Sequence, residues 1–523
     1  MSATFQGTSF IGYTRGETGS SLGSAINPAN GESFGPDYHA ASDAEVTKAI
    51  ELAGAAFPAY SNLPAAERAK FLRVIADKID AAVEDIAARG PLETGLPEPR
   101  MRGETARTTG QLRLFAGLIE EGSWVDARID HAQPDREPIP KPDLRAMKRP
   151  LGPVAVFCAS NFPLAFSVAG GDTAAALAAG CPVIAKAHSS HPGVAEIVGA
   201  CVAAAAQECG MPEGVFSLLY GGGRTVGMAL VKHPIMQAVG FTGSRAGGTA
   251  LMEAAAQRPQ PIPVYAEMSA VNPVVFLPAS LAKGGEALAE AFFGSLTLGV
   301  GQFCTNPGLV FLPEGHGDDF LAKLCDLVKG GAGGVMLNAG ICSAFAESTT
   351  AVAGMEGVET LAAAPTEDGR GTPAVFAVSL DRFREDPALQ AEMFGPATLV
   401  VRGKLEDMAA AMAGLEGQLV GTIHASPAEL SAHADLVTAL ESRVGRLVCN
   451  GFPTGVEVCP SMVHGGPYPA TSDGRSTSVG TMAIDRFCRP VSWQGFPDEA
   501  LPAELQESNP LGIWRLVDGE QKK

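Results

Sequence analysis

The sequence predicts an α/β protein that is built around a parallel sheet. From Pro153 onward, short apolar runs alternate with longer runs that have helical spacing. The five expected strands span residues 153–160, 182–187, 215–220, 236–242 and 262–267. Buried strands that alternate with helices form parallel sheets covered on both faces. Ligands bind such sheets at the carboxyl ends of the strands, so we look for a site there.

Composition and charge narrow the class of protein. The 523 residues are 46% hydrophobic and 18% charged, enough for two or three domains with large cores. The net charge of −19 argues against nucleic acid or an anionic membrane surface as a partner. No apolar run is long enough for a transmembrane helix, and the first residues do not resemble a signal peptide. The ten cysteines form no CxxC pair, so we expect reduced thiols in the cytoplasm.

The segments before the sheet are expected to pack rather than to react. Helices are predicted near residues 42–56, 64–90 and 101–119, after an N-terminal region of short strands and turns. Residues 132–149 then carry four closely spaced prolines, which exclude a helix or a central strand. This stretch is either a linker or an extended arm that pairs with another subunit.

Each of the five predicted strands is followed by, or ends in, a polar or glycine-rich feature. A lone polar group inside an apolar run costs free energy unless something satisfies it. Five such features at one edge of a sheet favour a binding site over five separate structural roles. The features are Asn161, Lys186, Gly221-Gly222-Gly223-Arg224, Gly243-Ser244 and Glu267.

Cys304 is the strongest candidate for a nucleophile. It lies in the segment GQFCTNPG, between an apolar helical run at 284–298 and a strand-like run at 309–312. Irregular turns beside rigid elements often display reactive side chains, and turn amides lower a thiol pKa. A buried, inert thiol is the alternative, and the other cysteines fit it. A second αβ region follows, with strands near 374–378, 398–401, 421–425 and 446–449.

The thiol, the amide and the carboxylate together suggest one chemistry. The thiolate would add to a carbonyl carbon, and Asn161 Nδ2 with the Cys304 N–H would hold the oxyanion. A nicotinamide would accept hydride, and Glu267 would activate the water that hydrolyses the thioester. The turn at residues 243–247 could face a pyrophosphate or be an ordinary helix cap. Lys186 could contact a ribose or phosphate or simply extend to solvent at a strand end.

Six segments of the chain resemble the aldehyde dehydrogenase superfamily over nearly the full length. They are CASNFPLAF with Asn161, VIAKAH with Lys186, GFTGS with Gly243 and Ser244, YAEMSAVNP with Glu267, GQFCTNPG with Cys304, and EMFGP with Glu392 and Phe394. The resemblance implies that Cys304 is the nucleophile, Glu267 the general base and Asn161 the oxyanion donor. It also implies that Glu392 holds the nicotinamide ribose and that Phe394 packs beside the ring.

The resemblance implies three structural parts. A Rossmann-like dinucleotide-binding domain would comprise residues 1–132 and 152–266, and an αβ catalytic domain residues 267–477. A β oligomerisation arm would comprise residues 133–151 and 478–500, which implies a homodimer or homotetramer.

Two positions depart from the usual family pattern. Ser269-Ala270 stands where Gly-Gly commonly follows the general base. Ser189 stands where an acidic residue often binds a free ribose 2′-hydroxyl. Without that acid a 2′-phosphate is not repelled, and Arg224 could pair with it. We therefore expect NADP as cofactor, with NAD also possible.

The substrate is expected to be a small aldehyde. The segments MVHGGPYPATSD and SVGTMAIDRF, with GQFCTNPG, resemble the branch that oxidises 2,5-dioxovalerate, and NADP-dependent fatty aldehyde dehydrogenases are similar there. A cation at the pocket mouth would favour the oxo-acid, and an apolar funnel the fatty aldehyde. Plausible walls of that pocket are Phe162, Phe303, Phe452 and Pro453.

Three rival classes remain open. A cysteine hydrolase needs a histidine oriented toward the thiol. The nine histidines include His188, His191, His424 and His464, but the sequence places none of them beside Cys304. A CoA-acylating dehydrogenase would pass the thioester to a thiol, whereas Glu267 favours water. A purely structural oligomer would not need Cys304, Glu267 and Asn161 together. No pattern indicates a metal site.

Overall fold

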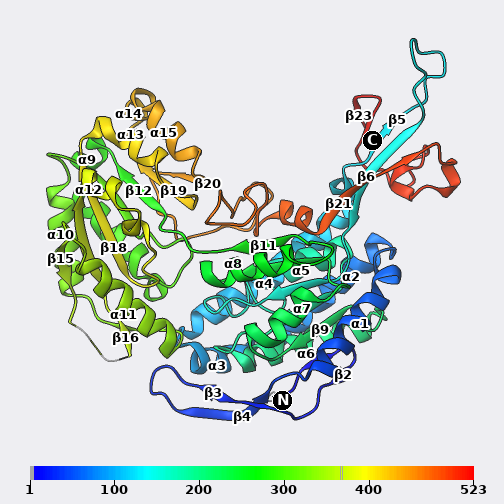
Figure 1. Cartoon of the computed structure of the whole chain (residues 1–523), viewed down its shortest axis with the longest axis horizontal. Coiled ribbons are helices and arrows are strands. Elements are labelled where there is room, and N and C mark those ends of the chain that lie inside the picture. Colours follow the sequence, from blue (N-terminus) through cyan, green and yellow to red (C-terminus); the bar gives the residue numbers. More distant parts are fainter. Residues whose placement is uncertain (1–4, 366, 368) are drawn as a thin grey trace.

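The computed structural model describes residues 5–365, 367 and 369–523. Two large sheets, each covered by helices, form two lobes, and a third sheet projects from one of them as an arm (Figure 1). Each lobe has its own core of fully buried aliphatic and aromatic side chains.

The first sheet has seven strands in the order β11-β10-β7-β8-β9-β1-β2. Its members are β1 Phe10–Ile11, β2 Thr14–Arg15, β7 Val154–Phe157, β8 Val183–Lys186, β9 Phe216–Leu219, β10 Ala238–Thr242 and β11 Val264–Glu267. The five strands from β7 to β11 pair in parallel, and β1 joins β9 antiparallel. The predicted parallel sheet is thus confirmed, and its strands end at one common edge.

Helices cover both faces of this sheet, and α2 packs against α4 and α6. They are α1 Asp43–Tyr60, α2 Ala65–Ala81, α3 Val83–Thr94, α4 Glu98–Glu121, α5 Gly171–Ala179, α6 Pro192–Glu208, α7 Met228–Lys232 and α8 Arg245–Ala256. The helix predicted at 64–90 is two helices, because the backbone at Ala82 leaves helical geometry. A π-helical turn, η2 at Gly223–Gly227, precedes α7.

The second sheet also has seven strands, in the order β15-β17-β18-β13-β12-β19-β20. They are β12 Pro273–Phe276, β13 Leu309–Pro313, β15 Glu359–Ala363, β17 Ala374–Ser379, β18 Ala397–Gly403, β19 Gln418–His424 and β20 Val444–Cys449. Only β15 pairs antiparallel. Its helices are α9 Pro278–Thr297, α10 Asp318–Lys329, α11 Ala339–Ala353, α12 Leu380–Glu385, α13 Leu405–Ala413, α14 Pro427–Ala432 and α15 Ala434–Glu441.

The arm is a five-stranded sheet in the order β21-β6-β5-β22-β23. Its strands are β5 Arg128–Asp130, β6 Leu144–Pro150, β21 Cys488–Gln494, β22 Arg515–Val517 and β23 Glu520–Lys522. The expected segments 133–151 and 478–500 supply β6 and β21, which pair along their whole length. The sheet also draws in residues outside those segments, because β22 pairs in parallel with β5.

The remaining regular elements are short. Two hairpin-like pairs are β3 Ser21–Ile26 with β4 Ser33–His39, and β14 Gly334–Val335 with β16 Arg370–Gly371. The 3-10 turns are η1 Ser123–Val125, η3 Leu298–Gly301, η4 Pro387–Gln390, η5 Thr481–Phe487, η6 Asp498–Ala500 and η7 Ala503–Leu505. Among the described residues, no helix combines the length and apolarity that a membrane span requires.

Candidate active site

Cys304 lies on an irregular turn between α9 and β13, as the sequence predicted. The backbone just before it is left-handed at Gly299, Val300 and Gly301. A side chain at Gly301 would meet the Gly395 backbone at 2.3 Å, so this close approach requires glycine. The buried Asn272 then donates through Nδ2 to the carbonyl oxygen of Cys304 at 2.8 Å. The turn that carries the thiol is therefore held by close backbone packing and by a side-chain hydrogen bond.

Glu267 is the last residue of β11 and is 2% exposed. Its Oε1 lies 2.9 Å from His464 Nε2, and its Oε2 accepts a hydrogen bond from Ser478 Oγ at 2.8 Å. Burial by itself would raise the pKa of this carboxyl. His464 and the hydrogen bonds from His464, Cys304 and Ser478 outweigh burial and hold the pKa of Glu267 below its ordinary value.

His464 lies beside the thiol, a position that the sequence does not predict. Its Nε2 is 3.5 Å from Cys304 Sγ and also contacts Glu267. The sulfur of Cys304, a carboxylate oxygen of Glu267 and a ring nitrogen of His464 all lie within 4.8 Å of one another. The segment MVHGGPYPATSD, which resembles the family, contains this histidine. It is far from Cys304 in sequence, however, and no spacing rule connects the two. The fold makes the connection by pairing Met268 with Ala470, just after that histidine.

The surroundings of Cys304 favour the protonated thiol. Burial, followed by the charge of Glu267, raises its pKa well above the ordinary value. A reaction that uses this sulfur therefore needs a base at hand, because the thiolate is the nucleophile. Glu267 and His464 are the groups placed to take the proton.

Asn161 follows β7 and is buried at the same site. Its Nδ2 donates to the carbonyl oxygen of Gln302 at 3.0 Å, two residues before the thiol. An amide nitrogen carries two hydrogens, so one remains for a further acceptor. Asn161 and Cys304 line the same cavity, which places this donor near any atom bonded to the sulfur.

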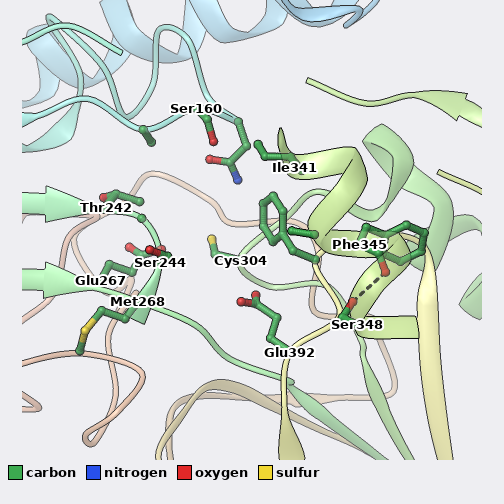
Figure 2. Close-up of a pocket in the computed structure, with 15 residues that line it drawn as sticks. Ser160, Thr242, Ser244, Glu267, Met268, Cys304, Ile341, Phe345, Ser348 and Glu392 are labelled. Carbon is green, nitrogen blue, oxygen red and sulfur yellow. Dashed lines mark hydrogen bonds between the residues drawn. The ribbon is translucent and has the colours of Figure 1, made fainter. Parts of the chain in front are cut away.

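A cavity of about 260 Å³ opens on one side of Cys304, between the two lobes (Figure 2). The sulfur faces into it, and Glu267 and Glu392 approach from different elements. Seven of the predicted site residues line it: Asn161, Gly243, Ser244, Glu267, Cys304, Glu392 and Phe394. The remaining three, Lys186, Ser189 and Arg224, are not part of this lining. They lie further along the same strand-end edge, at the end of β8, just after it, and in η2.

The strand-end residues fit a dinucleotide. A side chain at Gly243 would meet the Phe241 ring at 2.7 Å, so glycine keeps the turn before α8 open. Ser244 Oγ accepts from Gly247 N at 3.2 Å and caps α8, which confirms the capping role considered above. The first turn of α8 still offers backbone N–H groups to an anion. Lys186 forms no ion pair within the described part of the chain, and burial lowers its pKa.

Glu392 and Phe394 belong to a loop that is fastened to the thiol loop. Asn306 Nδ2 donates to the carbonyl oxygen of Gly395 at 3.0 Å. Burial raises the pKa of Glu392 to about 7, although a hydrogen bond from Ser269 acts in the opposite direction. Ser269, one of the two departures from the family pattern, thus contacts a predicted cofactor residue.

A second cavity, of about 290 Å³, reaches Cys304 from the other side. Aromatic rings from Phe162, Phe166 and Phe303 form one wall, and His464 lies at its base with the thiol. The expected wall residues Phe162 and Phe303 are therefore correct. Phe452 is not: its ring packs 4.8 Å from His424 and 5.9 Å from Phe292, in the core of the second lobe. Pro453 is outside the lining too, whereas Thr454 to Val456 belong to it.

A buried thiol, a carboxylate and an amide at the ends of parallel strands are the arrangement expected of a thiol-dependent oxidoreductase. The sequence model described as "Aldehyde dehydrogenase family" matches residues 13–467. The chain belongs to the aldehyde dehydrogenase family, whose members oxidise aldehydes with NAD or NADP.

Two relatives cover almost the whole chain. Alpha-ketoglutaric semialdehyde dehydrogenase 2 of Azospirillum brasilense is 52% identical over 501 residues, 95% of each chain. Alpha-ketoglutaric semialdehyde dehydrogenase of Acinetobacter baylyi is 44% identical over 523 residues, 98% of each chain.

Solved structures share the fold. A crystal structure of PnpE in complex with nicotinamide adenine dinucleotide has a TM-score of 0.79 and 24% identity, covering 94% of this chain and 97% of that one. Betaine aldehyde dehydrogenase of Staphylococcus aureus has a TM-score of 0.79 and 22% identity, covering 93% and 95%. At this identity the likeness bears on the fold alone, and it supports the predicted α/β class.

Proposed function

We propose that the protein oxidises 2,5-dioxovalerate, the semialdehyde of 2-oxoglutarate, to 2-oxoglutarate. The observation that carries the proposal is the contact of Cys304 with Glu267 and His464 at the point where two cavities meet. The substrate is supported by the two relatives that bear this activity in their names, at 52% and 44% identity.

The first step is attack of the sulfur on the aldehyde carbon. Glu267, oriented by His464 and Ser478, takes the thiol proton, because its own lowered pKa keeps it ionised at neutral pH. A C–S bond forms and the carbonyl oxygen becomes an oxyanion. Asn161 Nδ2 and the backbone N–H of Cys304 stabilise that oxyanion and so lower the barrier.

Hydride then leaves the thiohemiacetal carbon, and NAD or NADP supplies the acceptor when it is bound. The product on the protein is a thioester of Cys304. Glu267 first releases the thiol proton to solvent and is ionised again. It then takes a proton from water, the water oxygen bonds to the acyl carbon, and the sulfur leaves as thiolate. Glu267 therefore acts as the base twice in each cycle. It takes a proton from the thiol in the first step and a proton from water in the last.

Gly243 and Ser244 with the first turn of α8 would hold the pyrophosphate, and Lys186 a ribose or phosphate oxygen. Glu392 would accept from the nicotinamide ribose, and Phe394 would pack beside the ring. Arg224 is exposed in η2 beside the same edge, and Ser189 is neutral. A cation at this edge, with the neutral Ser189 in place of an acid, suits a 2′-phosphate, so we propose that NADP is used at least as well as NAD.

A steady-state panel tests this function. The substrates are 2,5-dioxovalerate, glutaraldehyde, succinic semialdehyde and a long alkanal, each with NAD and with NADP. We expect the highest kcat/KM for 2,5-dioxovalerate and no turnover in a Cys304→Ser variant. The exposed Cys449 is the matched control, and Cys449→Ser should behave as the wild type.

The long alkanal represents the alternative function. The rings of Phe162, Phe166 and Phe303 form an apolar wall that would also suit a fatty aldehyde. A higher kcat/KM for the alkanal than for the oxo-acid would favour a fatty aldehyde dehydrogenase. Hydrolysis of an ester or amide without any change in nicotinamide absorbance would instead favour a cysteine hydrolase. This activity should be measured because His464 lies beside the thiol, as such an enzyme requires.

We also propose a homo-oligomer in a reducing, cytoplasmic compartment. All ten cysteines are free. The segment that leads into β22 of the arm carries large apolar side chains on its surface, among them Leu511 and Trp514, at 52% and 50% exposed. Sedimentation of the intact protein at several concentrations tests the proposal, and a monomer at all of them would contradict it.

A further inference from the structure

Helix α4 carries two arginines that line the cavity on the aromatic side of Cys304. Arg100, Glu104 and Arg107 are spaced so that all three project from one face of the helix. This face and the rings of Phe162 and Phe303 enclose the cavity. A largely apolar pocket with a few convergent charged groups is typical of a small-ligand site.

Arg100 and Glu104 form an ion pair with each other. Arg100 Nε donates to Glu104 Oε1 at 2.7 Å, and the guanidinium lies 4.6 Å from the Phe162 ring centre and 4.7 Å from that of Phe303. Glu104 Oε2 accepts from the backbone amides of Leu164 and Ala165 at 3.3 and 3.4 Å. These two charges therefore support the wall of the pocket.

Arg107 lacks such a partner. Its Nη1 donates to the carbonyl oxygen of Val456 at 2.6 Å, and its Nε is buried without a hydrogen bond. In the described part of the chain, no carboxylate lies within ion-pair distance of it. Burial lowers its pKa, and the more distant charges of Glu104 and Cys304 only partly offset this. A guanidinium that is largely removed from water without an acid is costly unless a ligand supplies one.

The chemistry of the proposed substrate supplies that acid. A 2,5-dioxovalerate molecule has an aldehyde at one end and a carboxylate at the other, separated by a short carbon chain. Cys304 and Arg107 line the same cavity. The planar fork of arginine binds a carboxylate through two parallel hydrogen bonds.

We propose that Arg107 binds the substrate carboxylate and so orients the aldehyde carbon toward Cys304. The inference rests on the proposed function and adds the residue that distinguishes an oxo-acid from an uncharged aldehyde. The aromatic wall then packs on the carbon chain, while the charge at one end fixes which end meets the thiol. An uncharged aldehyde of the same length would bind in the same cavity without that orientation.

The test compares 2,5-dioxovalerate with pentanal, at saturating cofactor, in the wild type and in Arg107→Met. We expect kcat/KM for the oxo-acid to fall about 10- to 150-fold, mainly through KM, since hydrogen bonds to charged groups contribute in this range. Pentanal should change by less than about threefold, because it makes no ionic contact at this position. Arg107→Lys keeps the charge but loses the fork, and should lose less than Arg107→Met. The matched control is Arg113→Met on the same helix, whose guanidinium pairs with the exposed Asp77 and Asp80.

A binding measurement separates recognition from damage to the loop at Val456. By calorimetry, 2-oxoglutarate should bind the wild type and Arg113→Met equally, and Arg107→Met at least tenfold more weakly. Equal losses with pentanal and the oxo-acid in both Arg107 variants would overturn the anchor and leave the proposed function standing. A wild type that does not prefer 2,5-dioxovalerate to pentanal would overturn both.

Discussion

The two cavities that meet at Cys304 are built in different ways. The side lined by Gly243, Ser244 and Glu392 is made of strand ends and tight turns that face helix α11, and its charged side chains are acidic. The aromatic side is made of helix α4, the segment after β7, the thiol turn and a distant loop at residues 454–464. Its cation Arg107 has no carboxylate partner among the described residues. From this difference we infer that the two sides recognise their ligands in different ways. The first side would bind the cofactor common to the family through backbone geometry. The aromatic side would select one substrate through the identity of its side chains.

The largest expected effect concerns Glu267, the carboxylate beside Cys304. Glu267→Gln should lower steady-state kcat by about 10²- to 10⁴-fold, since a positioned base contributes this much. The first turnover should be slowed as well, because Glu267 also takes the thiol proton in the proposed first step. Rapid mixing should therefore show no burst of reduced nicotinamide before the slow steady state.

The control for this variant is Glu253→Gln, on the exposed face of α8. A burst of reduced nicotinamide that survives in Glu267→Gln would contradict the proposed first step. Glu267 would then be needed only for hydrolysis, and His464 would be the group that takes the thiol proton.

The second effect tests the histidine on the aromatic side. His464 lowers the pKa of Glu267, so His464→Leu should raise that pKa. Glu267 acts as a base only when ionised, above its pKa, so the acid limb of the kcat/KM profile should move to higher pH by about one unit. His316→Gln, an exposed histidine, should leave the profile unchanged. An unmoved acid limb in His464→Leu would show that Glu267 does not set it.

The third effect sharpens the cofactor side. Arg224→Ala should raise KM for NADP about tenfold, since a charge-assisted contact to phosphate is lost, and leave KM for NAD within about twofold. Lys232→Ala, an exposed cation at the end of α7, is the control. Similar changes for the two cofactors would remove Arg224 from recognition of the 2′-phosphate.

The smallest effect concerns Glu392. Its pKa is about 7, and only the ionised form accepts hydrogen bonds from two hydroxyls without competing protonation. KM for the cofactor should therefore fall a few-fold as pH rises through about 7. Glu392→Gln should abolish this dependence. Ser269→Ala should move it to higher pH, because the hydrogen bond from Ser269 lowers the pKa of Glu392. A pH-independent KM in the wild type would contradict the role of Glu392.

The same contrast explains what could be predicted from the sequence. Asn161, Lys186, Gly243 and Glu267 follow buried strands of a parallel sheet, so one topological rule places all of them at one edge. Cys304 was recognisable because a turn with several glycines separates a helix from a strand.

The aromatic side could not be predicted in this way. His464 and Arg107 reach the thiol only through packing between segments far apart in sequence, and neither has a local pattern that distinguishes it from a structural residue. Phe452 was wrongly assigned for the same reason: an aromatic residue near a loop gives no sign of the direction in which its ring points. Its ring fills the core beside Phe292.

Ser478, which donates to the carboxylate of Glu267, stands shortly before β21 in the chain. Between them η5 is clamped to the first lobe, because Arg486 Nη1 pairs with Asp172 Oδ1 at 2.6 Å in a buried position. One short segment, the orange-red trace in Figure 1, thus connects the residue that holds Glu267 with the edge strand of the projecting sheet. We therefore expect substitutions that unfold the projecting sheet to lower the rate of the reaction, even in molecules whose two lobes remain folded.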